Sequence, residues 1–314
     1  MGQKIVIALG GNAILKHKEK GTAEEQFANM HDACIHLAEL VKEHYRIILT
    51  HGNGPQVGDI LLQNELSRDT LPPMPLDVCG AESQGMIGYM LQQSLDNVLK
   101  ESGIRVPVVT VLTQTRVDRN DPAFSNPSKP IGPYYTAMEA SRLRKDRDWK
   151  IINDSGRGFR RMVPSPRPVS IVEGKIIKNA FESGAIVITG GGGGIPVIED
   201  EQGFLRGVEA VIDKDHSATL LATLVGADIL LILTDVEKVA LNFGKSDQQD
   251  LDHLTVQEAR QYLREGQFPP GSMGPKIEAS IEFVEAGGEK AVITSLDLKI
   301  EALRGQAGTT ISRR

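Results

Sequence analysis

Three lysines and an aspartate stand in contexts that suit chemistry on phosphate. Lys214 and Asp215 occur together in AVIDKDHS, where an apolar run gives way to a helical pattern. Asp215 is predicted to be the N-cap of that helix, and it could also orient ammonium groups or hold a metal near phosphates. Lys276, in PPGSMGPK, falls at a predicted helix start, where the helix dipole disfavours a cation, so it is a functional candidate. Lys129, in NPSKP, is by itself typical of an ordinary surface lysine.

Three glycine-rich loops each follow a strand-like run. A bare backbone lets N–H groups converge on phosphate oxygens, although a tight turn would explain either of the first two loops alone. The third, a run of five glycines, has the composition of a flexible linker. Its flanks are apolar, however, and holding five glycines in place costs roughly 0.5–1 kcal/mol each. Together the loops favour an ordered anion site; they are Gly10-Gly11-Asn12, Gly52-Asn53-Gly54 and Gly190–Gly194.

Common enzyme signatures are missing from the chain. The sequence has no GxGxxG, because the glycines of HGNGPQVG are spaced one residue too far apart. Gly244-Lys245-Ser246 resembles the end of a P-loop, but Val239 stands where its first glycine belongs. HExxH, GxSxG and Cys/His clusters with metal-ligand spacing do not occur either. Dinucleotide-binding, P-loop and metalloprotease or serine-hydrolase readings are therefore disfavoured.

Composition indicates a globular protein of 314 residues, with 40% hydrophobic, 24% charged and 4% aromatic residues. The net charge of −6 argues against general attraction to nucleic acid or to anionic membranes. Cys34 and Cys79 fit no metal or redox pattern and are expected to be buried thiols. The start of the chain has no signal-peptide pattern, and no apolar run is long enough to span a bilayer. We therefore expect a cytosolic protein.

Apolar runs alternate with helical patterns along the chain. Runs without alternation of apolar and polar residues are typical of strands buried on both faces of a parallel sheet. The alternation predicts an open α/β sandwich, whose ligands bind beyond the carboxyl ends of the strands. The glycine loops stand at those ends. The predicted strands are 5–9, 46–50, 106–112, 185–189, 229–233 and 291–294, and the clearest helices are 24–42 and 216–223.

The segment from about 118 to 168 differs in texture from the rest. It is rich in proline and in charge, which is typical of a long surface excursion or a small subdomain. Long insertions in compact domains are often functional, so a lid over the site is a refinement of this interpretation. The arginines at 157, 160 and 161 are interpreted as solvated lid surface or salt-bridge partners rather than as a substrate patch.

Eight motifs in order resemble the carbamate kinase branch of the amino-acid-kinase superfamily. They cover the chain from Ile5 to Ala279, and NPSKPIGP and VPSPRP set this branch apart from acetylglutamate and uridylate kinases. The motifs are IVIALGGNAI, THGNGPQVG, NPSKPIGP, DSGRGFRRMVPSPRP, GGGGGIPV, GVEAVIDKD, LILTDV and PPGSMGPKIEA.

The resemblance implies a three-layer αβα sandwich with a mainly parallel open sheet. It implies an N-terminal lobe of residues 1–205 that binds carbamate or carbamoyl phosphate and includes a protruding lid at 118–168. A C-terminal lobe, 206–314, would bind the nucleotide, and two chains would form a homodimer. The implied reaction is reversible phosphoryl transfer between ATP and carbamate with Mg²⁺, making ATP in arginine or agmatine catabolism.

The motif matches also imply residue roles. Lys129 would reach carbamoyl phosphate from the lid, Lys214 and Lys276 would contact the transferring phosphoryl group, and Asp215 would orient the lysines and assist the metal. The loop residues implied at the carbamate and phosphoryl site are Gly10, Gly11, Asn12, Gly52, Asn53, Gly54, Gly191 and Gly192. Those implied around the nucleotide are Thr234, Asp235, Val236, Phe243 and Met273.

Two residues depart from the family pattern. Phe159 stands where tryptophan is common, and Phe243 stands where tyrosine is common, which removes a hydroxyl near the nucleotide. Two alternatives remain beside the main reading. One is a kinase for another small acid such as acetylglutamate, and the other is a nucleotide-binding sensor without catalytic activity.

Overall fold

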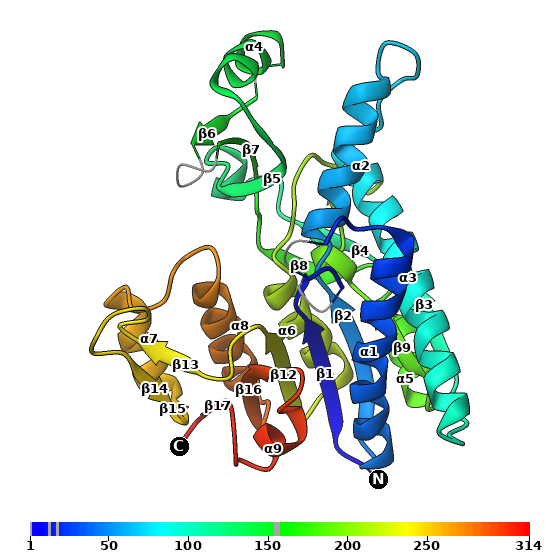
Figure 1. Cartoon of the computed structure of the whole chain (residues 1–314), viewed down its shortest axis with the longest axis vertical. Coiled ribbons are helices and arrows are strands. Elements are labelled where there is room, and N and C mark those ends of the chain that lie inside the picture. Colours follow the sequence, from blue (N-terminus) through cyan, green and yellow to red (C-terminus); the bar gives the residue numbers. More distant parts are fainter. Residues whose placement is uncertain (1, 12–13, 17–18, 148, 154–157) are drawn as a thin grey trace.

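A twisted eight-stranded sheet runs through the molecule in the order β15-β17-β16-β12-β1-β2-β9-β3 (Figure 1). Six neighbouring strands, from β16 to β3, are mutually parallel, and β17 pairs antiparallel to β16. The computed structural model describes residues 2–11, 14–16, 19–147, 149–153 and 158–314. The strands of this sheet are β1 (Lys4–Leu9), β2 (Arg46–His51), β3 (Val108–Val111), β9 (Ile186–Thr189), β12 (Ile229–Thr234), β15 (His253–Thr255), β16 (Lys290–Ser295) and β17 (Thr309–Ser312).

Helices cover both faces of this sheet, which gives the predicted three layers. The six parallel strands are those expected from the apolar runs, with ends that differ by two residues or fewer. One face carries α1 (Ala23–Lys42), α3 (Leu76–Glu101) and α9 (Lys299–Leu303). The opposite face carries α5 (Gly174–Glu182), α6 (Lys214–Val225), α7 (Val256–Arg264) and α8 (Met273–Glu285).

The residues of β1 show why both layers are apolar. Ile5, Ile7 and Leu9 enter the core on the α1 and α3 side, whereas Val6 and Ala8 enter the core on the α6 and α8 side. Successive side chains of a strand point to opposite faces, so a strand covered twice must be apolar throughout. The continuous apolar runs of the sequence follow from this burial.

A second, smaller sheet holds the base of the lid segment. Its order is β11-β10-β4-β8, with β4 (Gln114–Val117), β8 (Pro168–Ile171), β10 (Ile195–Glu199) and β11 (Leu205–Gly207). β4 and β8 pair antiparallel, with Val117 opposite Pro168. The chain therefore leaves the body after β4 and returns at β8, beside the point where it left.

Residues between β4 and β8 form a separate small unit, at the upper left in Figure 1. It contains a three-stranded sheet in the order β5-β7-β6 and the helix α4, with its own apolar cluster around Ala140, Leu143 and Ile151. This is the segment predicted to be a lid, and we call it the lid. Its elements are η2 (Pro122–Phe124), β5 (Lys129–Tyr135), α4 (Ala137–Arg147), β6 (Ile151–Asn153) and β7 (Phe159–Val163).

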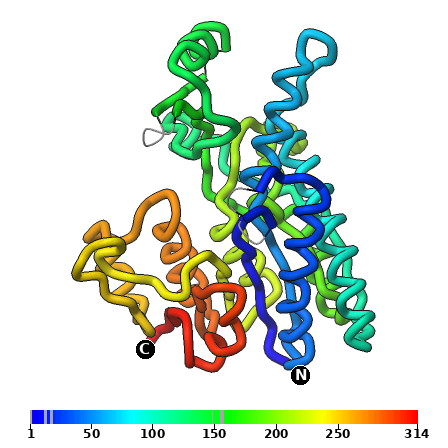
Figure 2. Tube along the Cα trace, viewed as in Figure 1, coloured from blue at the N-terminus to red at the C-terminus, as the bar shows by residue number. Residues whose placement is uncertain are grey.

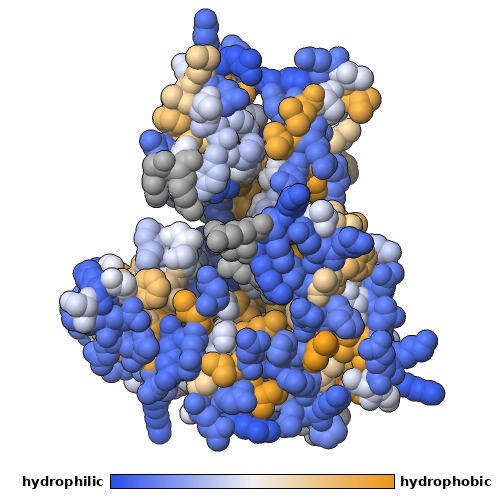
Figure 3. Space-filling view, viewed as in Figure 1, coloured by the Kyte–Doolittle hydropathy of each residue, from blue (hydrophilic) through white to orange (hydrophobic). Residues whose placement is uncertain are grey.

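The remaining elements are α2 (Gly54–Ser67) and the hairpin of β13 (Val239–Leu241) and β14 (Gln249–Leu251). Figure 2 shows that both chain termini lie at the end of the molecule opposite the lid. In Figure 3 this face is mostly hydrophilic, with scattered apolar residues. The predicted division at 205/206 falls inside β11, while the main sheet continues through both proposed lobes.

Two expectations about the chain as a whole can be compared with the structure. Cys34 and Cys79 are buried free thiols, as predicted, and burial raises the pKa of Cys34 to about 12 and that of Cys79 to about 11. No helix within the described ranges combines the length and apolar character needed to cross a bilayer.

Candidate active site

The five-glycine run is an ordered, buried turn between β9 and β10. Gly191–Gly193 form the short 3₁₀ turn η3, and Gly190, Gly192, Gly193 and Gly194 have φ values of 64°, 64°, 92° and 92°. Residues that carry a side chain rarely adopt such positive φ values. A Cβ on Gly191 would overlap the His51 ring, and one on Gly194 would overlap Thr115. Both conformation and crowding exclude side chains, so the run is not a linker.

Within this turn, several amides are already used by the fold. Gly190 N–H donates to Thr113 Oγ1 at 2.9 Å, Gly193 N–H donates to Gly190 O at 3.0 Å, and Gly194 N–H donates to Gly191 O at 3.1 Å. Gly192 lines a cavity together with the lysines, whereas Gly191 packs on His51. Of the two glycines predicted to bind ligand, Gly192 is therefore the better placed.

In the other two glycine loops, the glycines allow backbone segments to lie close together more than they provide free N–H groups. Gly10 N–H donates to Leu233 O, and Gly52 N–H donates to Leu9 O, each at 3.0 Å. Neighbouring strand ends therefore engage these two N–H groups. Gly11, Gly52 and Gly54 still line the cavities described below. Asn12 lies outside the described residues.

Asn53 stands at the start of α2, in the second of these loops. It is buried, and its Nδ2 donates to Ser83 Oγ at 2.8 Å. Its neighbour His51 is enclosed, and burial lowers the pKa of His51 to about 4, although a hydrogen bond to Gly52 O opposes the shift. The imidazole is therefore neutral at physiological pH and serves as packing beside the glycines.

The charged cluster lies at the first turns of α6 and α8. Asp213 is the N-cap of α6, since its side chain accepts from Asp215 N–H at 2.9 Å, and the prediction of Asp215 as the N-cap is wrong. Asp215 is instead in the first turn, with its side chain 3% exposed. One of its oxygens pairs with Lys214 Nζ and the other lies 3.3 Å from Lys276 Nζ.

The two lysines share one carboxylate and stand close enough to affect each other. Burial lowers the pKa of Lys276, the nearby Lys214 ammonium lowers it further, and Asp215 opposes the shift. Two ammonium groups share the single negative charge of the Asp215 carboxylate, so the pair of lysines leaves a local excess of positive charge. An anion bound there would complete the balance.

The third lysine comes from the lid. Lys129, at the start of β5, lies 2.6 Å from Asp213 Oδ2. Burial raises the pKa of Asp213, but the ammonium groups of Lys129 and Lys214 outweigh it and hold that pKa well below its ordinary value. The cluster therefore contains three lysines on two aspartates, drawn from the lid and from both helices.

Two cavities meet at Lys214 and Lys276. The smaller, of about 200 Å³, lies between the glycine loops and the lid and is lined by Gly52, Asn53, Gly54, Lys129, Gly192 and Asp213, among others. The larger, of about 760 Å³, is lined by Gly10, Gly11, Leu233, Thr234, Asp235 and Ser295, among others. Lys214, Lys276, Gly271 and Ser272 line both.

The predicted nucleotide residues divide into two groups. Thr234 and Asp235 line the larger cavity, at the end of β12. Val236 follows them, partly buried, and Met273 opens α8 and packs against the apolar core. Phe243, in the β13–β14 connection, is 62% exposed and is not among the residues that line the larger cavity.

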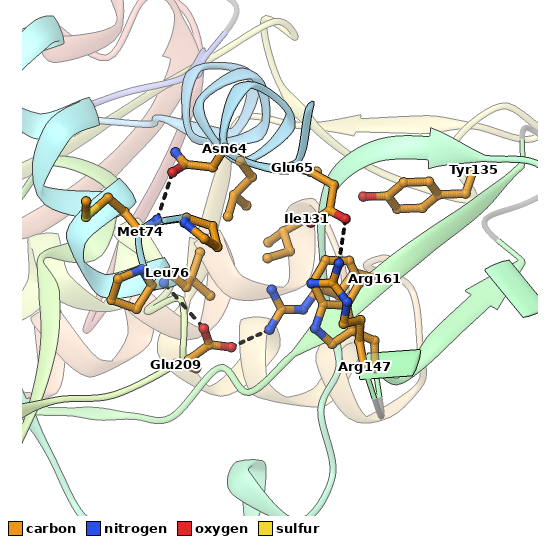
Figure 4. A pocket seen from close by; sticks show the side chains of 14 residues that line it. Asn64, Glu65, Met74, Leu76, Ile131, Tyr135, Arg147, Arg161 and Glu209 are labelled. Carbon is orange, nitrogen blue, oxygen red and sulfur yellow. Dashed lines mark hydrogen bonds and ion pairs between the residues drawn. The ribbon is translucent and has the colours of Figure 1, made fainter. Parts of the chain in front are cut away.

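The lid also contacts the body on a second side, around the cavity of about 260 Å³ shown in Figure 4. Arg161 pairs with Glu209, and Arg147 Nη2 lies 2.9 Å from Glu65 Oε1 in α2. The guanidinium of Arg161 also lies over the Trp149 ring, 4.2 Å from its centroid. The reading of Arg161 as a salt-bridge partner is therefore correct. The position at 157 lies outside the described residues.

The predicted role of Asp215 as a metal ligand has little room in this arrangement. Its two carboxylate oxygens already face Lys214 and Lys276. Among the residues that the structure describes, no three His, Cys, Asp or Glu side chains gather as a metal site. Mg²⁺ in phosphoryl-transfer sites is held by few protein groups and largely by phosphates and water. The donor set fits Mg²⁺ that arrives with the nucleotide, with Asp215 as an orienting group.

Sequence reasoning missed Asp213 and the loop residues Gly271 and Ser272. Asp213 was read as part of the stretch before the helix, although its Asp-Lys-Asp context offered two possible caps. Gly271 and Ser272 belong to the PPGSMGPK stretch that precedes Lys276. Their place at the junction of both cavities depends on how α8 meets α6, which local sequence does not encode.

Comparison with known proteins identifies the family of the chain. The model of the amino acid kinase family matches residues 3–295. The carbamate kinases of Thermococcus kodakarensis and Pyrococcus furiosus are 52% and 50% identical to the chain, over 99% of each sequence. A solved carbamate kinase from Giardia lamblia bound to AMP-PNP has a TM-score of 0.93 and 45% identity, covering 99% of this chain and 98% of its own. The chain belongs to the carbamate kinases of the amino acid kinase family.

Proposed function

We propose that the site transfers a phosphoryl group reversibly between ATP and carbamate, giving ADP and carbamoyl phosphate. The observation that carries this proposal is the meeting of two cavities at Lys214 and Lys276. The larger cavity has the volume of a small-molecule site, and the smaller one suits a compact acid. A phosphoryl group passing between them would cross the lysine pair.

The reaction needs positioning and charge neutralisation more than proton transfer. A carbamate oxygen attacks the γ-phosphorus in line, and the bond from phosphorus to the ADP oxygen breaks. Carbamate is already an anion, so no general base has to remove a proton. The developing charge lies on the phosphoryl oxygens, where preorganised cations are effective. Lys214 and Lys276 supply this charge, and Asp215 holds both ammonium groups in place.

Lys129 is proposed to act from the lid. It pairs with Asp213 at the edge of the smaller cavity, so a small shift would bring its ammonium to the anion in that cavity. The pair is partly exposed, with side-chain exposures of 35% for Lys129 and 17% for Asp213. Asp213 is the more buried partner, so the ammonium would leave it only for an anion that replaces this pairing. Asp213 would thus receive Lys129 whenever the substrate is absent.

Several further parts of the proposal rest on resemblance. Mg²⁺ bound to the nucleotide would neutralise phosphate charge. ATP and ADP are the expected nucleotides, which the AMP-PNP bound to the Giardia lamblia relative supports. The homodimer, a cytosolic location and ATP production in arginine or agmatine catabolism are predictions of the same kind.

The test is a coupled assay of ATP formed from ADP and carbamoyl phosphate with Mg²⁺. We expect ATP formation, and no ATP from folded protein would contradict the proposal. A panel with acetylglutamate and ATP separates the rival kinase from a carbamate kinase. ADP binding without turnover in either direction would instead support the sensor.

A further inference from the structure

A second cluster of charges lies beside the lysines on the same two helices. Its centre is Arg167, the last residue before β8. Arg167 Nη1 lies 2.8 Å from Glu282 Oε1, and Nη2 lies 2.7 Å from Glu278 Oε2. Nη1 is also 2.6 Å from Nδ1 of His216, whose side chain is 8% exposed. One guanidinium therefore contacts α6 and α8 together.

The partners of Arg167 stand close to the phosphoryl-site lysines in the chain. His216 follows Lys214 by two residues in α6, and Glu278 follows Lys276 by two residues in α8. Glu278 lies in the second turn of α8, directly after the turn that holds Lys276. A shift of the start of either helix that moved His216 or Glu278 would also move the neighbouring lysine. The relative position of the two helix starts decides where both ammonium groups point.

Arg167 also belongs to the base of the lid. Its main-chain N–H donates to Asp121 Oδ2 at 2.9 Å, and Asp121 Oδ1 accepts from Ala123 N–H at 2.8 Å. Asp121 lies on the outgoing segment of the lid, and Arg167 lies on the returning one. The residue that bridges the two helices is thus fixed to both segments that connect the lid to the body.

We propose that Arg167 is a positioning residue for phosphoryl transfer. It holds the first turns of α6 and α8 in register, so that Lys214 and Lys276 face one point, and it joins this register to the base of the lid. The inference rests on the proposed function, because it assigns Arg167 a part in that reaction. Arg167 acts through Lys214 and Lys276 and does not itself contact the reacting atoms.

Because the Arg167 cluster is partly exposed, its effect on the position of the lysines can be distinguished from its effect on the stability of the fold. The side chains of Arg167, Glu278 and Glu282 are 53%, 36% and 46% exposed. Ion pairs this exposed contribute little to the free energy of unfolding. Without the guanidinium, however, Glu278 and Glu282 keep only the His216 ring as a shared neighbour, at 3.4 Å and 3.2 Å, and their like charges repel at i,i+4 spacing. We therefore expect loss of Arg167 to disturb the first turn of α8 more than the fold.

The forked guanidinium of Arg167 is required to contact Glu278 and Glu282 together. Its two nitrogens reach two different carboxylates, whereas a lysine ammonium is a single point of charge on a flexible stem. An Arg167→Lys change keeps the charge but bridges the two glutamates poorly. A free guanidinium ion has the missing shape and charge, and can enter the partly exposed site of an Arg167→Ala variant.

The experiment compares Arg167→Met with Arg260→Met in the full chain. Arg260 pairs with Glu285 at the far end of α8 and is 49% exposed, so its loss removes a similar ion pair away from the lysines. We expect kcat for ATP formation to fall about 10- to 100-fold in Arg167→Met, the scale of a small misplacement of catalytic groups. KM values and the melting temperature should stay near those of Arg260→Met.

Three further readouts test the mechanism. Guanidinium chloride, but not sodium chloride at equal ionic strength, should partly restore kcat of Arg167→Ala. Arg167→Lys should stay closer to Arg167→Met than to wild type. Hydrogen exchange should accelerate in the first turns of α6 and α8 in Arg167→Met and remain unchanged there in Arg260→Met.

Each contrary result has a distinct meaning. If Arg167→Met keeps kcat within twofold of Arg260→Met, the inference is wrong. A loss of kcat matched by a loss of melting temperature, without rescue by guanidinium, would make Arg167 a merely structural residue and also overturn it. An inactive wild-type protein would overturn the proposed function and this inference together, whereas an active wild type with an unaffected variant overturns the inference alone.

Discussion

The glycine turn and the lid face the same small cavity but are held in opposite ways. Gly190–Gly194 are buried, and four of the five have positive φ values, with neighbours that leave no room for a Cβ. The lid meets the body through a small apolar cluster, in which Ile131 and Val163 of the lid pack on α2 and α3. It is also joined to the body by pairs of charges, namely Lys129–Asp213, Arg161–Glu209 and Arg147–Glu65. One wall of the site is fixed by packing alone, and the other combines packing with charge pairs that can exchange.

The glycine turn and the lid therefore have different roles in the site. Close packing permits one arrangement, because any displacement opens voids or creates overlaps. Partly exposed ion pairs hold a segment weakly and are screened by salt. The glycine turn thus defines where the substrate sits, while the lid can adjust to it. The following predictions test this contrast, beginning with the largest effect.

Gly193→Ala should damage the turn severely. The new Cβ would overlap the carbonyl oxygen of Ile212, a backbone atom that cannot rotate away, at a φ of 92°. We expect the free energy of unfolding to fall by about 3–5 kcal/mol, measured by chemical denaturation.

The matched control is Gly184→Ala. Gly184 has a φ of 95° but no atom within 4 Å of the added Cβ, so the control carries the backbone strain without the crowding. We expect a loss of about 1–2 kcal/mol there. Equal losses in both variants would show that crowding does not hold the turn.

Lys276→Met should lower kcat by about 10²–10³, as removal of a preorganised charge donor does in other enzymes. The Lys276 ammonium contacts a buried aspartate and cannot be replaced by a mobile group.

Lys129→Met should affect KM for carbamoyl phosphate more than kcat, because Lys129 belongs to the lid, which can adjust to the substrate. Steady-state kinetics with exposed Lys145→Met as the control would check this order, and a larger kcat loss for Lys129→Met would reverse it.

His51 should make the packed wall sensitive to acid. Below its ordinary pKa of 6.5 the unfolded chain binds a proton there, whereas the folded chain binds it only near pH 4. Stability should therefore fall as pH drops from about 6.5 to about 4, and level off for this group below that. His51→Gln should flatten this part of the pH profile of unfolding, and exposed His253→Gln should not.

Arg161→Gln should have the smallest effect on stability, less than about 1 kcal/mol, since Glu209 is half exposed. We expect KM for carbamoyl phosphate to rise a few fold, and added salt to raise the wild-type KM in the same direction. Arg206→Gln, which removes an ion pair with Asp200 outside the lid, is the control. A salt-independent KM would contradict weak attachment of the lid.

The sequence predicted the sheet better than the details of the site. Strands buried on both faces need continuous apolar runs, so β1, β2, β9 and β12 were visible as runs, and the glycines marked their ends. The N-cap of α6 was misplaced because Asp213 and Asp215 are equally suitable cap residues two positions apart. Only the path of the chain into the helix decides between them.

Contacts between distant segments were beyond the sequence. The Lys129–Asp213 pair joins residues 84 apart, and Arg167 reaches Glu282 across 115. Both contacts depend on how the lid is placed on the body. Similarly, the N–H groups of Gly10 and Gly52 donate to strand carbonyls in other parts of the chain, and the glycine pattern does not reveal these contacts. Residue type indicated the chemistry, but tertiary pairing decided which atoms remain for it.

The antiparallel pair of β4 and β8 has a consequence for how this chain could be altered. Since Val117 and Pro168 are neighbours, everything between them is, in topological terms, one long hairpin connection. A short turn could close that hairpin without rethreading the main sheet. A chain shortened at this point would keep the strand order of the eight-stranded sheet, but it would expose to solvent both the anion pocket and the α2 and α3 side chains that Ile131 and Val163 cover.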